Sequence, residues 1–169
     1  MIKNSKIKIG LVGCGRISKY HIDSIFSFKN FNLISICDNN QKKLDNYKHL
    51  DCLKYLSLNK MLKENQFDIL VICTPNGLHF KQAKLALEHN VNVIVEKPLS
   101  LSSLQCTILK NEFKKKKLFI FVVMQNRFNP TISFLKKIKD KNYLGKINFV
   151  IINVLWNRPQ SYFSQDKWR

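Results

Sequence analysis

Short strand-like runs alternate with amphipathic segments along most of the chain, and this alternation is what most constrains its fold. Strand-like runs stand at 7–12, 33–37, 69–73, 91–95 and 118–124. Helical spacing of apolar residues occurs between them, at 17–28, 57–64, 78–89 and 102–116. Apolar strands separated by amphipathic helices predict a parallel sheet covered on both faces. The expected fold class is therefore α/β, a doubly wound parallel sheet of the Rossmann type.

The pattern changes beyond residue 124. A turn and a helix are expected at 129–139, and a further turn precedes a β-rich run at 147–156. This run is longer than the earlier strands and has no later partner in the chain, so it would expose a pairing edge. We therefore expect a Rossmann domain at 1–124, a connecting turn and helix at 125–146, and at 147–169 the first strand of an incomplete α+β C-terminal domain for substrate binding or oligomerisation.

The formal net charge of +18 raises nucleic acid as a partner, because basic side chains neutralise phosphates. Of the 29 basic residues, however, 25 are lysine and only 4 are arginine, the side chain that reads bases through its planar fork. The two lysine clusters, at 114–117 and 136–141, lie where helices are expected to end, and cations there suit the helix dipole. We interpret them as solvated helix ends that also favour anionic small molecules.

The cysteines and the apolar runs indicate the compartment. Five cysteines occur without a CxxC spacing, and Cys14, Cys37 and Cys73 fall in or beside expected strands, where a free thiol packs like a small apolar residue. Reduced cysteines are expected, with no metal site. The longest apolar run, Leu118–Met124, is too short to span a bilayer, and the polar start of the sequence lacks the apolar stretch of a signal peptide. A soluble, cytoplasmic protein is expected.

A glycine-rich loop, Gly10-Leu-Val-Gly13-Cys-Gly15-Arg-Ile-Ser18, joins the first expected strand to the first helix. Gly13 permits a tight turn, Gly15 lets a pyrophosphate approach the backbone, and the following helix offers unpaired N–H groups to phosphates. Ser18 stands at the third glycine position of G-x-G-x-x-G and is small enough for close helix–strand packing. In this strand–loop–helix context the loop predicts a dinucleotide site.

Asp38 ends the second expected strand, where a dinucleotide site places an acid on the adenosine ribose. A carboxylate there accepts hydrogen bonds from the ribose hydroxyls and repels a 2′-phosphate, which favours NAD over NADP. The alternative is that Asp38 is the N-cap of a helix from Asn39 onward. The glycines upstream favour the ribose role.

Two further polar groups follow expected strands, at the edge where open α/β sheets bind ligands. The first contains Thr74, Asn76 and His79. The alternatives for these residues are that Thr74 and Asn76 cap the next helix and that His79 is a surface histidine.

The second group is Glu96-Lys97-Pro98. A residue before proline is held extended, which would aim Lys97 at the cleft. Its ammonium can hydrogen-bond a substrate hydroxyl and assist its deprotonation as hydride leaves the same carbon.

These motifs together resemble a known family. Gly13-x-Gly15-Arg-Ile, Cys-Asp38, Thr74-Pro-Asn-x-x-His79 and Glu96-Lys97-Pro98 resemble the N-terminal domain of the glucose-fructose oxidoreductase / inositol dehydrogenase / MocA family. The likeness runs over essentially the whole chain. Its later segments, Gln125–Pro130 and Trp156–Arg169, are similar to bacterial UDP-N-acetylglucosaminuronate 3-dehydrogenases. Those enzymes oxidise the C3 hydroxyl of the sugar with NAD in lipopolysaccharide and O-antigen sugar synthesis.

The resemblance implies roles for individual residues. Contacts with the cofactor NAD are implied for Gly13, Gly15, Arg16, Ile17, Asp38, Thr74, Pro75, Asn76, His79, Glu96, Lys97, Trp168 and Arg169. Lys97 is implied to be catalytic. An anionic sugar nucleotide would face Lys97, Arg127, Arg158, Gln160 and Tyr162. The alternatives are that Trp156 and Tyr162 only pack and that Arg158 forms a surface ion pair.

The resemblance also bears on what this chain can do alone. In the family a C-terminal domain supplies most of the substrate pocket and a catalytic histidine, a place that none of the four histidines here occupies. The expected function is an NAD-dependent oxidoreductase acting on C3 of UDP-N-acetylglucosaminuronate, present as its N-terminal half. A noncatalytic NAD-binding remnant and one half of a split dehydrogenase are alternatives, and a basic nucleic-acid-binding protein is a distant third. Expected partners are a small-molecule sugar nucleotide and either a complementary C-terminal chain or a second copy in a homo-oligomer, with neither nucleic acid nor membrane.

Overall fold

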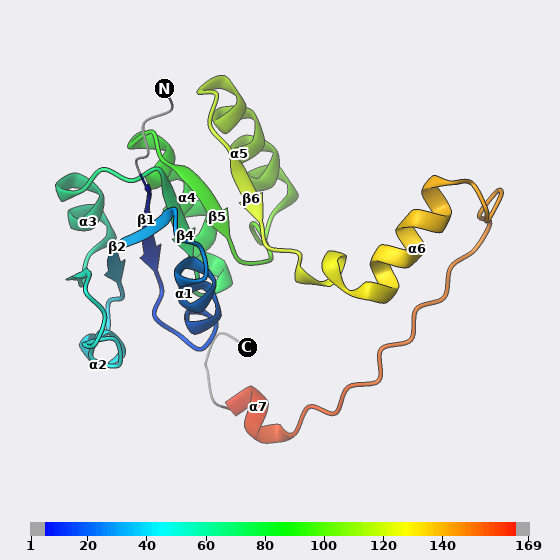
Figure 1. The fold of residues 1–169 in the computed structure, drawn as a ribbon, viewed down its shortest axis with the longest axis horizontal. Coiled ribbons are helices and arrows are strands. Elements are labelled where there is room, and N and C mark those ends of the chain that lie inside the picture. The colour runs from blue at the N-terminus through cyan, green and yellow to red at the C-terminus, as the bar shows by residue number, and fades with distance from the viewer. Residues whose placement is uncertain (1–5, 165–169) are drawn as a thin grey trace. The chain divides into compact units, whose positions relative to one another are not determined.

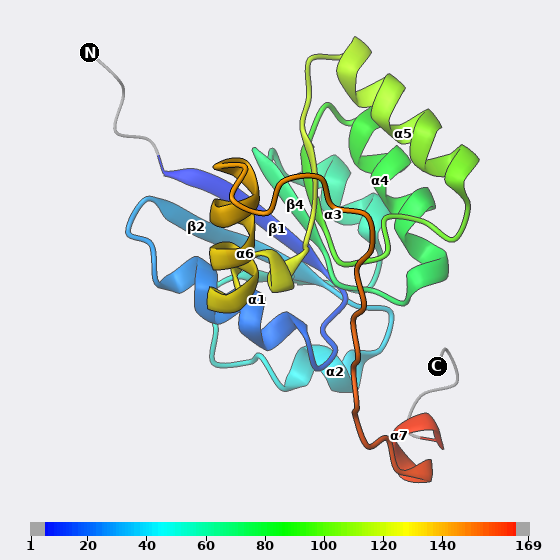
Figure 2. The same ribbon diagram turned by 90° about the vertical axis from the view of Figure 1, so that its right-hand side faces the viewer.

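The computed structural model describes residues 6–164 (Figures 1 and 2). The chain divides into two compact units, with the boundary between Val123 and Met124. Within the described residues, no helix has both the length and the apolar character that a membrane crossing needs.

The first unit is built on a parallel sheet of six strands in the order β3-β2-β1-β4-β5-β6. The strands are β1 (Ile7–Val12), β2 (Phe31–Cys37), β3 (Leu53–Tyr55), β4 (Ile69–Ile72), β5 (Asn92–Val95) and β6 (Ile120–Val122). The order reverses between β1 and β4, which opens a crevice at the carboxyl ends of these strands. The predicted doubly wound α/β fold is confirmed.

Helices cover both faces of this sheet (Figure 1). They are α1 (Ser18–Phe26), α2 (Gln41–Asp45), α3 (Leu58–Glu64), α4 (His79–Glu88), preceded by the 3-10 turn η1 (Asn76–Leu78), and α5 (Ser103–Lys115). On one face, Ala86 of α4 and Phe113 of α5 are among the side chains buried against the sheet. On the other face, Ile22 of α1 and Leu44 of α2 are buried. The two apolar clusters explain why the strands are apolar on both sides.

The last strand of the sheet differs from its prediction. The run 118–124 was expected as a fully buried strand, but only Ile120–Val122 pairs, at the edge of the sheet beside β5. Phe119 and Phe121 are 63% and 56% exposed, and their rings stack with centroids 5.9 Å apart. The prediction of full burial is wrong because alternate side chains point to opposite faces of the sheet: Ile120 and Val122 pack against the core, whereas Phe119 and Phe121 point away from it.

Two short elements of the first unit, α2 and β3, have no counterpart in the predictions. Helix α2 begins after Asn40, whose side-chain oxygen accepts a hydrogen bond from the backbone N–H of Lys42, and strand β3 adds three residues to the edge beside β2. Elements of three to five residues carry too few apolar positions to show a period.

The second unit contains η2 (Gln125–Phe128), α6 (Pro130–Asp140) and α7 (Gln160–Ser164). Asn129 caps α6 by accepting a hydrogen bond from the N–H of Thr131, with Pro130 in the first turn. The expected strand at 147–156 does not form among the described residues. Its side chains are exposed, Leu155 by 94%, because no described strand is there to pair with it.

Candidate functional site

The glycine loop between β1 and α1 needs its two glycines for different reasons. Gly13 has φ +94°, and a Cβ on it would lie 2.6 Å from the carbonyl carbon of Cys73. Its N–H donates to the carbonyl oxygen of Cys37 over 2.8 Å, so the loop sits tightly between the ends of β2 and β4. A Cβ on Gly15 would meet nothing within 4 Å. Gly13 is therefore required by the fold, whereas Gly15 leaves open space beside the backbone.

Ser18 replaces the third glycine and is completely buried. Its hydroxyl donates to the carbonyl oxygen of Gly15 over 2.6 Å, and its Oγ lies 2.9 Å from the Tyr47 hydroxyl. The hydroxyl thus ties the start of α1 to the segment that follows α2. No side chain caps α1 at Ile17, so its first N–H groups keep the capacity to bind an anion.

Asp38 lies at the carboxyl end of β2 with its side chain 6% exposed. One carboxylate oxygen accepts the backbone N–H of Cys14 over 2.9 Å, and the other accepts that of Asn40 over 2.9 Å. The ammonium of Lys43 is 3.9 Å away. The helix-cap alternative is wrong, because Asn40 is the N-cap of α2. The carboxylate is instead fixed against the glycine loop.

A cavity of about 400 Å³ opens beside this carboxylate. It is lined by Cys14, Gly15, Arg16, Lys19, Lys43, Asn46 and Tyr47. Three of these residues are cationic, which suits an anionic ligand. Open space at Gly15, an uncapped α1 and a fixed carboxylate together fit the adenosine and pyrophosphate half of a dinucleotide. Sequence reasoning missed Lys19, Lys43, Asn46 and Tyr47, because no motif marks any of them.

The segment after β4 carries Thr74, Pro75, Asn76 and His79. The Thr74 hydroxyl donates to the side-chain oxygen of Gln82 over 2.5 Å, and no side chain caps η1 or α4. The capping alternative for Thr74 and Asn76 is therefore wrong.

His79 is completely buried, so the surface alternative for it is also wrong. Its Nδ1 lies 2.7 Å from the carbonyl oxygen of Pro98, and its Nε2 lies 2.8 Å from that of Thr74. The ring joins the segments that follow β4 and β5. His79 thus contacts backbone on both sides within the domain.

Glu96 and Lys97 directly follow β5. The Glu96 side chain is 12% exposed and hydrogen-bonds the Nε2 atom of His21, on α1, over 2.8 Å. Lys97 is exposed, and its peptide bond to Pro98 is cis. The fold therefore brings the predicted cofactor residues of this unit to the carboxyl ends of β1, β2, β4 and β5, with Lys97 among them.

The cysteines of this edge are unreactive by environment. All five cysteines are free thiols. Burial, followed by the nearby Asp38 carboxylate, raises the pKa of both Cys14 and Cys37 to about 12. Burial and the charge of Glu96 raise the pKa of Cys73 as well. Within residues 6–164, no group of three or more His, Cys, Asp or Glu side chains could hold a metal ion.

The predicted substrate residues of the second unit lie on and before its short helices. Arg127 is in η2, and Gln160 and Tyr162 are in α7. The guanidinium of Arg158 lies 4.8 Å from the Trp156 ring centroid and 4.4 Å from that of Tyr162. The predicted cofactor residues Trp168 and Arg169 lie outside the described residues.

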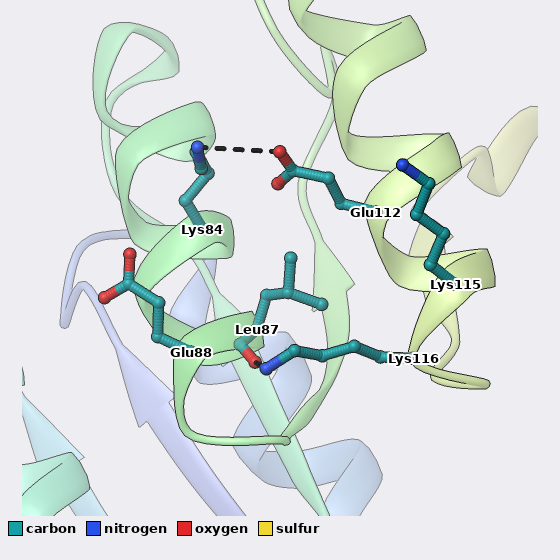
Figure 3. A pocket seen from close by; sticks show the side chains of 6 residues that line it. All are labelled: Lys84, Leu87, Glu88, Glu112, Lys115 and Lys116. Carbon is teal, nitrogen blue, oxygen red and sulfur yellow. Dashed lines mark hydrogen bonds and ion pairs between the residues drawn. The ribbon is translucent and has the colours of Figure 1, made fainter.

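A second cavity, of about 290 Å³, lies between α4 and α5 (Figure 3). An ion pair of 3.7 Å between Lys84 and Glu112 crosses it, and the ammonium of Lys116 donates to the carbonyl oxygen of Leu87 over 2.8 Å. None of the predicted site residues lines this cavity.

Comparison with known proteins identifies the family. Residues 7–124 match the glucose-fructose oxidoreductase / inositol dehydrogenase / MocA oxidoreductase family, which has an NAD-binding Rossmann fold. The chain belongs to this family. The match covers the glycine loop, Asp38 and the segments that follow β4 and β5, and it confirms both the predicted resemblance and NAD as the cofactor.

Solved structures of two relatives are similar over nearly the whole chain. The WlbA dehydrogenase of Bordetella pertussis, in complex with NADH and UDP-GlcNAcA, is 37% identical with a TM-score of 0.93 over 97% of this chain and 51% of its own. WlbA of Chromobacterium violaceum, with the same two ligands, is 34% identical with a TM-score of 0.95, over 99% of this chain and 49% of its own.

A curated relative is more distant. The glucose-6-phosphate 3-dehydrogenase of Bacillus subtilis is 25% identical over 83% of this chain and 40% of its own length. The chain therefore spans about half or less of the length of the relatives it matches.

Proposed function

We propose that this chain supplies the NAD-binding part of a dehydrogenase that oxidises the C3 hydroxyl of UDP-N-acetylglucosaminuronate, in lipopolysaccharide and O-antigen sugar synthesis. The observation that carries the proposal is the high similarity to two WlbA dehydrogenases in complex with NADH and UDP-GlcNAcA. The arrangement of Asp38, Gly15 and Lys97 at one edge of the sheet supports it.

The residues around the cavity would hold the adenosine half of the cofactor. The Asp38 carboxylate retains lone pairs for the ribose hydroxyls, although each of its oxygens already accepts one backbone N–H. The uncapped start of α1 and the open side of Gly15 would receive the pyrophosphate, with Arg16 and Lys19 nearby. When bound, NAD supplies the hydride acceptor.

Lys97 would act on the substrate hydroxyl. As the carbon loses hydride, the hydroxyl oxygen must lose its proton, and Lys97 is a polar group that can hold that oxygen and assist the proton's departure. Its side chain is exposed and thus accessible to a substrate.

Cationic residues of the second unit would recognise the anionic sugar nucleotide. The guanidinium of Arg158 stacks on two aromatic rings and keeps its N–H edge for a carboxylate or phosphate. Gln160 and Tyr162 are close to it in sequence, on α7. Arg127, in η2, is a further cation of this unit.

Calorimetry on the 169-residue chain tests the cofactor part of the proposal. We expect saturable binding of NADH, and we expect UDP-N-acetylglucosaminuronate to bind the NADH complex more tightly than glucose 6-phosphate. Absence of NADH binding, together with salt-dependent binding of duplex DNA, would instead favour a nucleic-acid-binding protein. NADH formation by this chain alone, on adding NAD and the UDP-sugar, would contradict the expectation that turnover needs a histidine of a C-terminal domain.

Asp38 provides a sharper prediction. Asp38→Ala is expected to weaken NADH binding by about 1 to 3 kcal/mol, because the ribose hydroxyls lose a charged acceptor. The affinity for NADPH should fall less, because the carboxylate that repels a 2′-phosphate is also removed. Asp51→Ala, at an exposed position, is the matched control. Equal loss of affinity for both cofactors would contradict a ribose contact.

A further inference from the structure

A hydrogen bond that no motif predicts joins α1, the helix after the glycine loop, to the segment that carries Lys97. The Nε2 atom of His21, on the helix that begins at the glycine loop, lies 2.8 Å from Oε1 of Glu96. The two side chains are only 17% and 12% exposed, so water competes weakly for either partner. Glu96 is the residue before Lys97, and its own backbone N–H donates to the carbonyl oxygen of Ile72, in β4, over 3.0 Å.

The surroundings of Glu96 favour its charged form. Burial on its own would raise the pKa of Glu96, but the hydrogen bond and charge of His21 lower it, as do the backbone N–H and the charge of Lys97, and the net effect is a lowered pKa. A carboxylate that is charged and mostly buried needs its partner, because an unpaired buried charge is costly. The contact with His21 is therefore part of what holds Glu96 in place.

The segment around Lys97 is held on both sides. Before Lys97, the Glu96 side chain is tied to α1 through His21. After Lys97, the carbonyl oxygen of Pro98 is tied to α4 through Nδ1 of His79. Lys97 is exposed between these two attachments, so its backbone is fixed while its side chain is accessible. Fixed backbone beside an accessible amine is what substrate positioning requires.

We propose that His21 is a positioning residue that holds Glu96, and through it the backbone of Lys97, in a fixed position relative to the first turn of α1. The inference rests on the proposed function, in which that first turn receives the pyrophosphate and Lys97 acts on the substrate hydroxyl. Because the hydride passes from the carbon of that hydroxyl to the nicotinamide, the Glu96-Lys97 segment then lies toward the nicotinamide. His21 then sets the spacing between the two halves of the cofactor site. Its loss affects the nicotinamide half and spares the adenosine half.

Two ligands separate these halves in the 169-residue chain. ADP-ribose contains the adenosine, pyrophosphate and second ribose, whereas NADH adds the nicotinamide, whose fluorescence reports its surroundings. In His21→Phe, which keeps a ring but no hydrogen bond, the dissociation constant for NADH should rise about 10-fold while that for ADP-ribose changes by less than about 2-fold. The fluorescence change of NADH on binding should shrink as well.

Variants at the same two positions test the mechanism. His21→Gln offers an amide N–H to Glu96 and should restore most of the NADH affinity. The double variant His21→Phe with Glu96→Gln should bind NADH no more weakly than His21→Phe alone, since both changes remove one interaction. His89→Phe, at the C-cap of α4, is the matched control and should leave both affinities unchanged. Thermal unfolding of every variant confirms that it is folded.

The outcomes are distinct. An equal loss of affinity for NADH and ADP-ribose in His21→Phe, or no loss for either, overturns the positioning role while the proposed function stands. Failure of His21→Gln to recover NADH binding also overturns it. If the wild-type chain binds neither ligand, the proposed function itself is overturned, and this inference with it.

Discussion

At the scale of single residues, the same substitution at the two glycines of the loop between β1 and α1 should affect different properties: stability at Gly13 and NADH binding at Gly15. Gly13→Ala places a Cβ 2.6 Å from the Cys73 carbonyl carbon at a positive φ, so we expect the free energy of unfolding to fall by at least about 2 kcal/mol. Gly15→Ala meets no protein atom within 4 Å, so the variant should remain as stable as the wild type but bind NADH more weakly.

Urea unfolding and calorimetry on both variants check this pair. Normal NADH affinity in a stable Gly15→Ala variant would show that no ligand approaches the backbone there. A Gly13→Ala variant of wild-type stability would contradict the tight fit between the ends of β2 and β4.

Ser35 on β2 is another single residue with a clear expectation. Its hydroxyl is a buried side-chain polar atom without a hydrogen-bond partner among residues 6–164. Ser35→Ala should therefore raise the free energy of unfolding by about 1 kcal/mol, because a buried unpaired hydroxyl is unfavourable. Ser18→Ala is the comparison, since it removes two hydrogen bonds and should lower stability by about 1 to 2 kcal/mol. Differential scanning calorimetry would show the two shifts, and a stabilised Ser18→Ala variant would contradict this account.

At the scale of secondary-structure elements, His79 connects α4 to two loops. His79→Leu keeps an apolar volume but leaves the buried contacts to the carbonyl oxygens of Thr74 and Pro98 unmade, so stability should fall by about 2 to 4 kcal/mol. His89→Leu, at the other end of α4, should cost less than about 1 kcal/mol. Hydrogen exchange should also accelerate at the start of α4 in His79→Leu alone. Equal losses of stability in His79→Leu and His89→Leu would contradict the conclusion that His79 holds the two loops in place.

The elements of the fold differ in how far the sequence alone predicts them. The glycine loop and the long strands were predictable because their signals are local: a spacing of glycines and runs of apolar residues. The role of His79 and the contact of His21 with Glu96 were not, because each joins residues distant in sequence. The edge position of β6 depends on strand order, and the expected strand at 147–156 needs a neighbour to form its ladder. Such features depend on contacts between distant parts of the chain, so no local pattern in the sequence predicts them.

At the scale of the whole molecule, the buried thiols should make stability depend on alkaline pH. In the folded chain the pKa of Cys14 and of Cys37 is about 12, against 9.0 for an ordinary thiol. Between these values the unfolded state loses a proton that the folded state keeps, so stability falls as pH rises. Each thiol contributes a slope of about 1.4 kcal/mol per pH unit in this window. Below pH 9 neither state ionises, and the contribution to stability is fully present.

Cys37→Ala isolates this effect from the titration of the many lysines, which also lose charge at alkaline pH in both states. The variant loses some stability at every pH because a small cavity forms, but its slope between pH 9 and 11 should be shallower than that of the wild type by about 1.4 kcal/mol per pH unit. Ile36→Val, at a fully buried neighbour without an ionisable group, should keep the wild-type slope. Urea unfolding in a reducing agent at several pH values measures both. If the free energy of unfolding had the same slope against pH in all three proteins, the pKa of Cys37 would have to be the same in the folded and the unfolded chain. That result would contradict the raised pKa that its burial predicts.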